Sequence, residues 1–287
     1  MLLNLPIQLR DHIQLGKKPL ELLTSSRFPG IISLFRVNLQ PNPSQITYSY
    51  NDYNNIWTID GASVKCCFHV LEWWLNAHNG SGLELKYTKL AINHASWNGH
   101  VEVLEWWLKA HNEFGLELKY DVYAIDRASE YGYVNVLEWW EKANKEIGLK
   151  LKYSGNAIVW ACWNGHVDVL EWWLKAHHNH GLELKYGFNA INWASLRGQV
   201  EVLEWWKNSG LELKYTKGAN DQASANGHIS VLEWWKNSGL ELKYSVGALN
   251  CAWLDRRRMI QVLEWWKNSG LEPPESVERI SNSKIKN

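Results

Sequence analysis

The chain carries no excess of charge of either sign, since 30 Lys and Arg residues balance 30 Asp and Glu residues among 287. A surface that binds duplex nucleic acid usually shows a basic excess on one face. The balance therefore disfavours a nucleic-acid binder and leaves it only as a minor alternative. A locally basic stripe is still compatible with a balanced total.

Cysteine is scarce as well. The four Cys residues have no paired metal spacing and are too few for a disulfide scaffold, which favours a reducing compartment. Cys66 and Cys67 are adjacent, and we expect both on one short helix. No run approaches 18 apolar residues, and Met1 to Pro6 lack a basic segment, so we expect neither a membrane span nor a signal peptide. These absences predict a soluble, cytoplasmic protein.

Catalytic motifs are absent too. We find no Gly-rich phosphate loop, nucleophile elbow or HExxH motif. Carboxylates recur in every repeat, as parts of a scaffold do, rather than as one inward pair. His177, His178 and His180 form the richest histidine cluster, but on a helix they should diverge and remain solvated. We therefore expect no enzyme, catalytic residue, cofactor or metal site.

What is present is a repeat. Leu-Glu-Trp-Trp begins at Leu71, Leu104, Leu137, Leu170, Leu203, Leu232 and Leu263, with spacings of 33, 33, 33, 33, 29 and 31 residues. A fixed period in this range is the signature of stacked-repeat proteins. We therefore divide the chain into a non-repeat cap (residues 1–50), a repeat array (51–272) and a C-terminal capping turn with a tail (273–287).

The second unit, residues 90–120, shows the local pattern. Small and apolar residues from Ala91 to Ser96 recur at helical spacing, Asn98-Gly99-His100 ends this inner helix, and a second, outer helix contains Trp106 and Trp107. Residues 116–120 alternate in polarity and should run extended. Units one to four carry four extra residues after the Trp pair, so their outer helices should be about one turn longer than those of units five to seven. In unit seven Leu254 to Arg258 replaces Asn-Gly-His, and we expect its arginines in a solvated turn.

The segment Ala91 to Leu104, AINHASWNGHVEVL, resembles the ankyrin repeat, whose pattern runs T-P-L-H-x-A-A-x-x-G-H-x-x-V-V. The resemblance covers residues 55–272, and its Gly-His recurs at Gly99-His100, Gly165-His166 and Gly227-His228. The family's Thr-Pro is absent, and its protruding finger is shortened. The family's His is replaced at Asn93, Asp126, Val159, Asn192, Asp221 and Asn250. The resemblance implies an all-α, ankyrin-like α-solenoid of seven helix-turn-helix units with end caps, which serves as a binding scaffold without catalysis. We expect a monomer.

The seven Trp pairs have two readings. Fourteen Trp residues in one register are compatible with a ligand-stacking ladder, as aromatics form for bases. A recognition surface, however, differs from unit to unit, whereas these pairs do not vary. We therefore expect the pairs to form the core between successive units.

Residues that vary from unit to unit mark the candidate site. In the inner helices two positions three residues apart differ freely, while the positions before them stay small or apolar. These variable positions should face the concave groove of the stack, where aromatic residues are the usual anchors of a protein partner. Packing between units is the alternative. The candidate partner-binding residues are His94, Trp97, Tyr123, Arg127, Glu130, Trp160, Trp163, Phe188, Trp193 and Leu196.

The sequence therefore predicts a protein-interaction scaffold that binds an unidentified protein or peptide partner in the concave groove. One alternative comes from residues 5–9, Leu-Pro-Ile-Gln-Leu, which faintly resemble the start of an F-box. That resemblance implies a substrate-recognition adaptor of a ubiquitin ligase.

Overall fold

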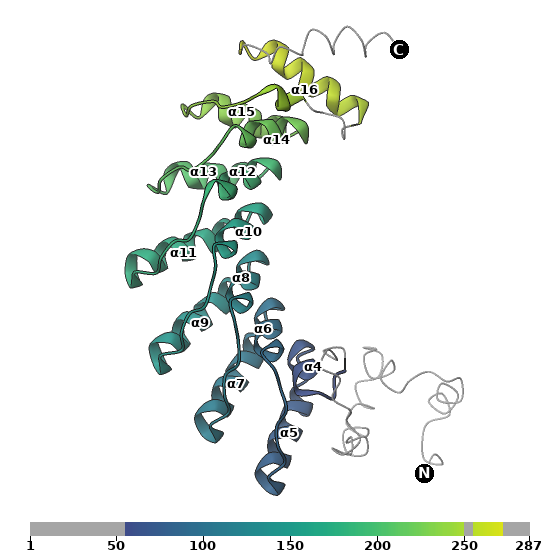
Figure 1. Ribbon diagram of the computed structural model, residues 1–287, viewed down its shortest axis with the longest axis vertical. Helices are drawn as coiled ribbons and strands as arrows, with labels where there is room; N and C mark the ends of the chain where they lie inside the picture. Colours follow the sequence, from purple (N-terminus) through teal and green to yellow (C-terminus); the bar gives the residue numbers. More distant parts are fainter. Residues whose placement is uncertain (1–54, 250–254, 272–287) are drawn as a thin grey trace, which may run out of the picture. The chain divides into compact units, whose positions relative to one another are not determined.

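A computed structural model describes residues 55–249 and 255–271, which belong to the unit Asp52–Asn287. These residues form thirteen α-helices, one 3-10 helix and no β-strand. Successive pairs of a short inner helix and an outer helix stack in chain order (Figure 1). The predicted caps at residues 1–50 and 273–287, with the F-box-like segment, lie outside the described residues.

The inner helices are α4 (Ile59–Val64), α6 (Leu90–Trp97), α8 (Tyr123–Glu130), α10 (Asn156–Asn164), α12 (Phe188–Leu196), α14 (Gly218–Ala225) and the 3-10 helix η2 (Val246–Leu249). The outer helices are α5 (Phe68–Ser81), α7 (Val101–Phe114), α9 (Val134–Ile147), α11 (Val167–His180), α13 (Val200–Asn208), α15 (Ile229–Asn237) and α16 (Arg256–Asn268).

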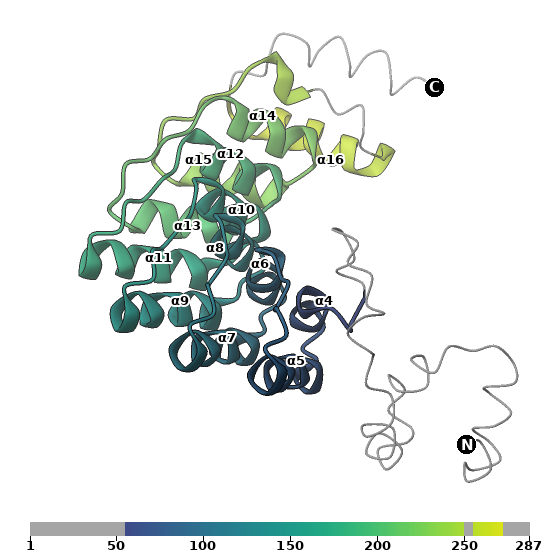
Figure 2. The same ribbon diagram turned by 60° about the horizontal axis from the view of Figure 1, so that its bottom comes forward.

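The inner and outer helices form two separate rows, which both views of the ribbon show (Figures 1 and 2). The inner row packs closely because it buries alanine, for example Ala124, Ala128, Ala157 and Ala161, all fully inaccessible to solvent. The outer row buries Trp instead, and its helices spread further apart in Figure 1. The predicted all-helical stack of hairpins is therefore confirmed.

The predicted difference in outer-helix length holds through unit six. Helices α5, α7, α9 and α11 have 14 residues, whereas α13 and α15 have nine. The prediction is wrong for α16, which has 13 residues. This helix gains its extra length at the N-terminal end, because Asp255 caps it by accepting a hydrogen bond from the backbone N–H of Arg258.

Two local predictions at the turns are also wrong. Arg256, Arg257 and Arg258 are exposed as expected, but they form the first turn of α16 instead of a loop. Cys66 and Cys67 lie in the turn between α4 and α5, not on one helix. Cys66 takes the left-handed conformation, with φ of 54°, at the place where later units have glycine.

The Trp pairs form the core, as predicted. The second Trp of every pair is 1% exposed or less, and five of the seven first Trp residues are buried. Trp73 and Trp234 are half-buried. Within each pair the rings meet edge to face, with centroids 5.0 Å apart in Trp172 and Trp173.

From unit two onward, each second Trp joins its own unit to the previous one through its indole N–H. Trp140 donates to Ser96 Oγ at 3.1 Å and Trp173 to Ser129 Oγ at 3.2 Å. In the next unit Trp206 donates to Cys162 Sγ at 3.3 Å, and burial raises the pKa of that thiol to about 12. These bonds satisfy buried donors that would otherwise destabilise the fold.

The first Trp of a pair reaches the glutamate of the preceding Leu-Glu-Trp-Trp. Trp106 donates to Glu72 Oε1 and Trp205 to Glu171 Oε1, both at 2.7 Å. Trp139 and Trp172 lack such a partner for their buried N–H groups. For Trp139 the expected acceptor, Glu105, instead accepts a bond from Lys142 at 3.3 Å.

The position where the ankyrin pattern has His forms a polar joint with the start of the next unit. Asp126 accepts bonds from the backbone N–H of Ser154 at 2.9 Å and from its hydroxyl at 2.5 Å. Asn192 makes the same joint to Thr216, accepting at 3.1 Å and donating to the hydroxyl at 2.8 Å. Sequence reasoning treated these residues only as departures from the family.

Replacing Asp126 by asparagine should leave the protein at least as stable at pH 7, because Asn192 shows that an amide satisfies this joint. Desolvation by burial is the main cause that raises the pKa of Asp126 above its ordinary value of 3.8, although its hydrogen bonds with Ser154 oppose the rise. The folded state therefore holds this proton more tightly than the unfolded state, and stability falls as pH rises between the two pKa values.

Asp126→Asn removes this loss of stability with rising pH. The free energy of unfolding of the variant, relative to that of the native chain, should therefore increase from pH 3.8 upward and then level off. Urea unfolding across this pH range is the measurement. The control Asp126→Ala leaves the Ser154 groups unpaired and should lower the free energy of unfolding by about 1–3 kcal/mol. An Asn variant as destabilised as the Ala variant would contradict the assignment.

Candidate partner-binding face

Helices α6, α8, α10 and α12 bring the variable residues to one surface of the inner row, which we call the inner face. Every one of the ten predicted site residues is at least partly accessible to solvent. The two flanking rings, Tyr123 and Phe188, are 50% and 52% exposed. The structure therefore places the predicted residues together on consecutive helices. The inner face consists of His94, Trp97, Tyr123, Arg127, Glu130, Trp160, Trp163, Phe188, Trp193 and Leu196.

Arg127 is the centre of the first half of the inner face. Its guanidinium carbon lies 4.9 Å from the centroid of the Trp97 ring and 4.5 Å from that of Trp160, so one cation contacts aromatic rings of both neighbouring units. Glu130, one turn further along α8, forms an ion pair with the same guanidinium. The His94 ring meets Trp97 edge to face at 5.0 Å, and burial lowers the pKa of His94 against the opposing effect of Asp60.

Trp163 and Trp193 form the second half. Their ring centroids are 5.3 Å apart in an edge-to-face arrangement between α10 and α12. The guanidinium of Arg197 covers the Trp163 ring at 4.9 Å. In both halves the rings thus pack across the boundary between units while one side stays accessible to solvent. Packing between units is therefore part of what these residues do.

Two residues that adjoin the inner face were missed from the sequence. Tyr131, which is 45% exposed, lies 6.1 Å from the Trp97 ring, and Arg197 covers Trp163 in the equivalent way. A sequence signal for both residues was present in the turn between the inner and the outer helix. Asn98, Asn164 and Asn226 occupy the same position in units two, four and six, so Tyr131 and Arg197 are the departures from that pattern within units two to six.

The Gly of each turn leaves room for the next unit. Gly132 has φ of 78°, and a Cβ atom added there would lie 2.8 Å from Nδ1 of His166. Gly198 stands in the same relation to His228, also at 2.8 Å. The Gly-His pattern therefore has two physical causes: a left-handed backbone and the close approach of a ring from the next unit.

Two residues of the histidine cluster make polar contacts at the C-terminal end of α11. His177 Nδ1 lies 2.8 Å from the carbonyl oxygen of Leu182, and His180 Nε2 lies 2.7 Å from Glu141 Oε1. In the described part of the chain, no three His, Cys, Asp or Glu side chains gather in a way that would hold a metal ion. Nor is any helix of residues 55–249 or 255–271 both long and apolar enough to cross a bilayer.

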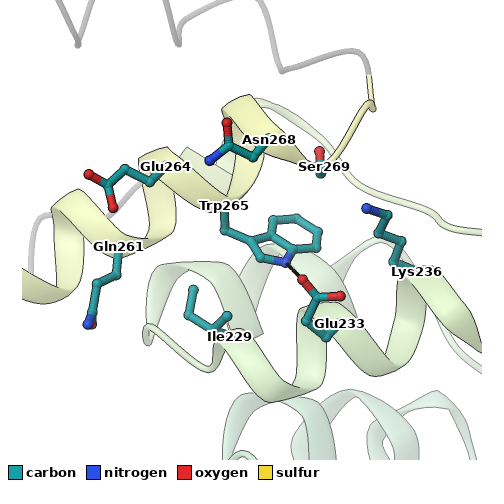
Figure 3. A pocket seen from close by; sticks show the side chains of 8 residues that line it. All are labelled: Ile229, Glu233, Lys236, Gln261, Glu264, Trp265, Asn268 and Ser269. Atoms are coloured by element: carbon teal, nitrogen blue, oxygen red, sulfur yellow. Dashed lines mark hydrogen bonds between the residues drawn. The ribbon is translucent and has the colours of Figure 1, made fainter.

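A cleft of about 580 Å³ lies away from the inner face, between the outer helices α15 and α16 (Figure 3). Trp265 lies beside it and donates its N–H to Glu233. Ser269 already donates its hydroxyl hydrogen to the carbonyl of Trp266. Three of the residues lining this cleft, Glu233, Trp265 and Ser269, thus already form hydrogen bonds within the last two units, and none of the predicted site residues borders it.

Comparison with known proteins gives no assignment, because no family model and no curated protein matches the sequence.

Proposed function

We propose that the chain is an ankyrin-like α-solenoid whose inner face binds a protein or peptide partner, as a scaffold without catalysis. The short inner helix, the left-handed glycine turn and the longer outer helix support the ankyrin-like assignment. No β-strand lies in residues 55–249 or 255–271, which agrees with a shortened finger.

One observation carries the proposed function. The repeated Trp residues are buried between units, whereas the residues that differ between units gather on a single face and include two rings that are about half exposed. Burial of Tyr and Trp side chains supplies much of the binding energy at protein interfaces. Because Arg127 and Arg197 cover faces of Trp97, Trp160 and Trp163, those faces are closed to stacking nucleobases. This favours a protein partner over nucleic acid.

The double variant Tyr123→Ala/Phe188→Ala should lower partner recovery roughly tenfold or more, because buried aromatic anchors are each worth about 2 kcal/mol or more. We choose these two rings over Trp160 and Trp163 because they are more exposed and contribute less to packing. Affinity capture from cells of the source organism, quantified by mass spectrometry against the native chain, is the measurement.

The matched control is Phe114→Ala, since Phe114 is 39% exposed at the end of outer helix α7. Both variants should unfold within about 0.5 kcal/mol of the native chain, as surface substitutions usually do. Equal recovery with the double variant, or equal loss with Phe114→Ala, would refute binding at the inner face.

A further inference from the structure

Exposed arginines lie at the turn of unit five, where Arg197 adjoins the inner face, and at the start of α16 in unit seven. Arg197 and Arg257 align in sequence, two units apart, when the chain is aligned on its Trp pairs, although Arg197 ends α12 and Arg257 lies in the first turn of α16. Arg256 and Arg258 flank Arg257 at the start of α16, and all four arginines are exposed. His228 lies at the turn of the unit between them. We call Arg197, Arg256, Arg257 and Arg258 the basic strip.

His228, in unit six, lies between these arginines along the chain. The His228 ring rests against Gly198, beside Arg197. Desolvation is the main cause that lowers the pKa of His228; a bond to the Leu196 carbonyl opposes it, and the positive charges of Arg197 and Arg258 lower it further. Arginines from units five and seven therefore both act on one ring in unit six.

The fold itself does not require these charges. The first turn of a helix favours acidic side chains over basic ones, because the N-terminal end of the helix dipole is positive. Three successive arginines there oppose that preference. Arg258 has one weak ion pair, 3.6 Å from Asp255, while Arg197, Arg256 and Arg257 form no ion pair among the described residues.

We propose that the basic strip binds an Asp/Glu-rich segment of the same partner that contacts the inner face. This inference rests on the proposed function for the identity of the partner. Successive helices in a stack are about 10 Å apart, and side chains of consecutive helical residues point about 100° apart, so the guanidinium groups do not converge on one point. Several carboxylates of an extended or helical peptide suit such separated charges better than a single phosphate, which needs several donors converging on one point.

The ring that adjoins the strip argues against nucleic acid at this end of the inner face. Trp163, the nearest aromatic partner of Arg197, is covered by that guanidinium at 4.9 Å and meets Trp193 edge to face. The guanidinium therefore closes one face of this ring to a stacking base. An acidic peptide segment needs only the positive charges of the strip and no free aromatic face.

The test measures binding of the full chain to a fluorescent peptide of alternating Glu and Gly residues, by anisotropy at low salt. The strip variant Arg256→Gln/Arg257→Gln should weaken binding roughly tenfold, because two exposed charge contacts are lost. The control Lys236→Gln/Lys267→Gln removes the same charge from exposed positions on outer helices α15 and α16. It should change binding less than twofold.

A further variant and a melting measurement show whether the lost charge, and not a changed side-chain shape or loss of folding, causes the weaker binding. Arg256→Lys/Arg257→Lys should retain most of the affinity, because the charges remain. The strip variant should melt at the same temperature as the native chain or higher, since it removes cations from a helix N-terminus. Equal weakening by the strip and control variants would show nonspecific attraction and overturn the proposal.

Two comparison ligands separate the alternative occupants. Tighter binding of a phosphoserine peptide of the same net charge, lost in the strip variant, would assign the strip to phosphate and overturn the acidic-segment proposal. Tighter binding of an oligonucleotide, also lost in the strip variant, would overturn it in favour of nucleic acid.

Failure of the proposed function can be told apart from failure of the strip proposal. The test peptide contains no aromatic residue, so its binding does not depend on the inner face. If Tyr123→Ala/Phe188→Ala abolishes partner capture while the strip variant leaves peptide binding unchanged, the strip is refuted and the inner face stands. If the strip variant loses peptide binding but the aromatic variant captures partner normally, the strip stands and the inner face is refuted.

Discussion

Replacing Trp173 by alanine should lower the free energy of unfolding by about 3–5 kcal/mol, the range for truncating a fully buried Trp. Trp173 is 1% exposed and lies at the centre of the array. The variant would lose its edge contact with Trp172, its contact with Tyr153 at 4.7 Å and its bond to Ser129. Urea unfolding followed by far-ultraviolet circular dichroism is the measurement, since the other Trp residues dominate fluorescence.

Two control variants identify the source of this effect. Trp173→Phe keeps a ring in the core and should cost less than the alanine variant, although it also loses the Ser129 bond. Trp234→Ala removes a half-buried Trp and should cost less as well. If Trp173→Ala unfolds within 1 kcal/mol of the native chain, the repeated Trp pairs are not the core that joins the units.

Replacing Gly132 by alanine should lower the free energy of unfolding by about 2–5 kcal/mol, the sum of two separate terms. A left-handed backbone costs an alanine about 1–2 kcal/mol, and Gly132 has φ of 78°. Overpacking costs about 1–3 kcal/mol, and the new Cβ atom would lie 2.8 Å from the His166 ring of the next unit.

Gly148 provides a matched control at the end of α9. Its φ is 71°, but a Cβ atom added there meets nothing within 4 Å. Gly148→Ala should therefore show only the backbone cost. In a His166→Ala background the Gly132 substitution should approach that smaller value, and a double-mutant cycle by urea unfolding measures the difference. Equal costs for Gly132→Ala and Gly148→Ala would contradict the close approach of consecutive turns.

The repeated features could be predicted from the sequence because they depend on spacing within one unit. Burial of Trp173, the turn at Gly132 and the extra turn of α11 all follow from residues that recur with the same period. The start of α16 was also within reach, since Asp255 is a favoured N-cap residue before three good helix formers.

The contacts between units could not be predicted, because they depend on the distance between neighbouring helices. Nothing in the spacing of Arg127 indicates that its guanidinium lies between Trp97 and Trp160, which come from two different units. The joint between Asp126 and Ser154 spans 28 residues and becomes visible only once the units are stacked. The predicted site residues were brought together, and packing between units, which the sequence left as the alternative, is part of what they do. The participation of Tyr131 emerged from the structure.

The central claim is that the buried Trp pairs hold the stack together and leave the inner face to bind a partner. Photo-crosslinking tests it most directly, with benzoylphenylalanine placed in living cells at Tyr123, at Phe188 or at Phe114. We expect an adduct with the same protein from Tyr123 and Phe188, and none with that protein from Phe114. Adducts that are equally abundant from Phe114, or unrelated proteins captured from Tyr123 and Phe188, would contradict it.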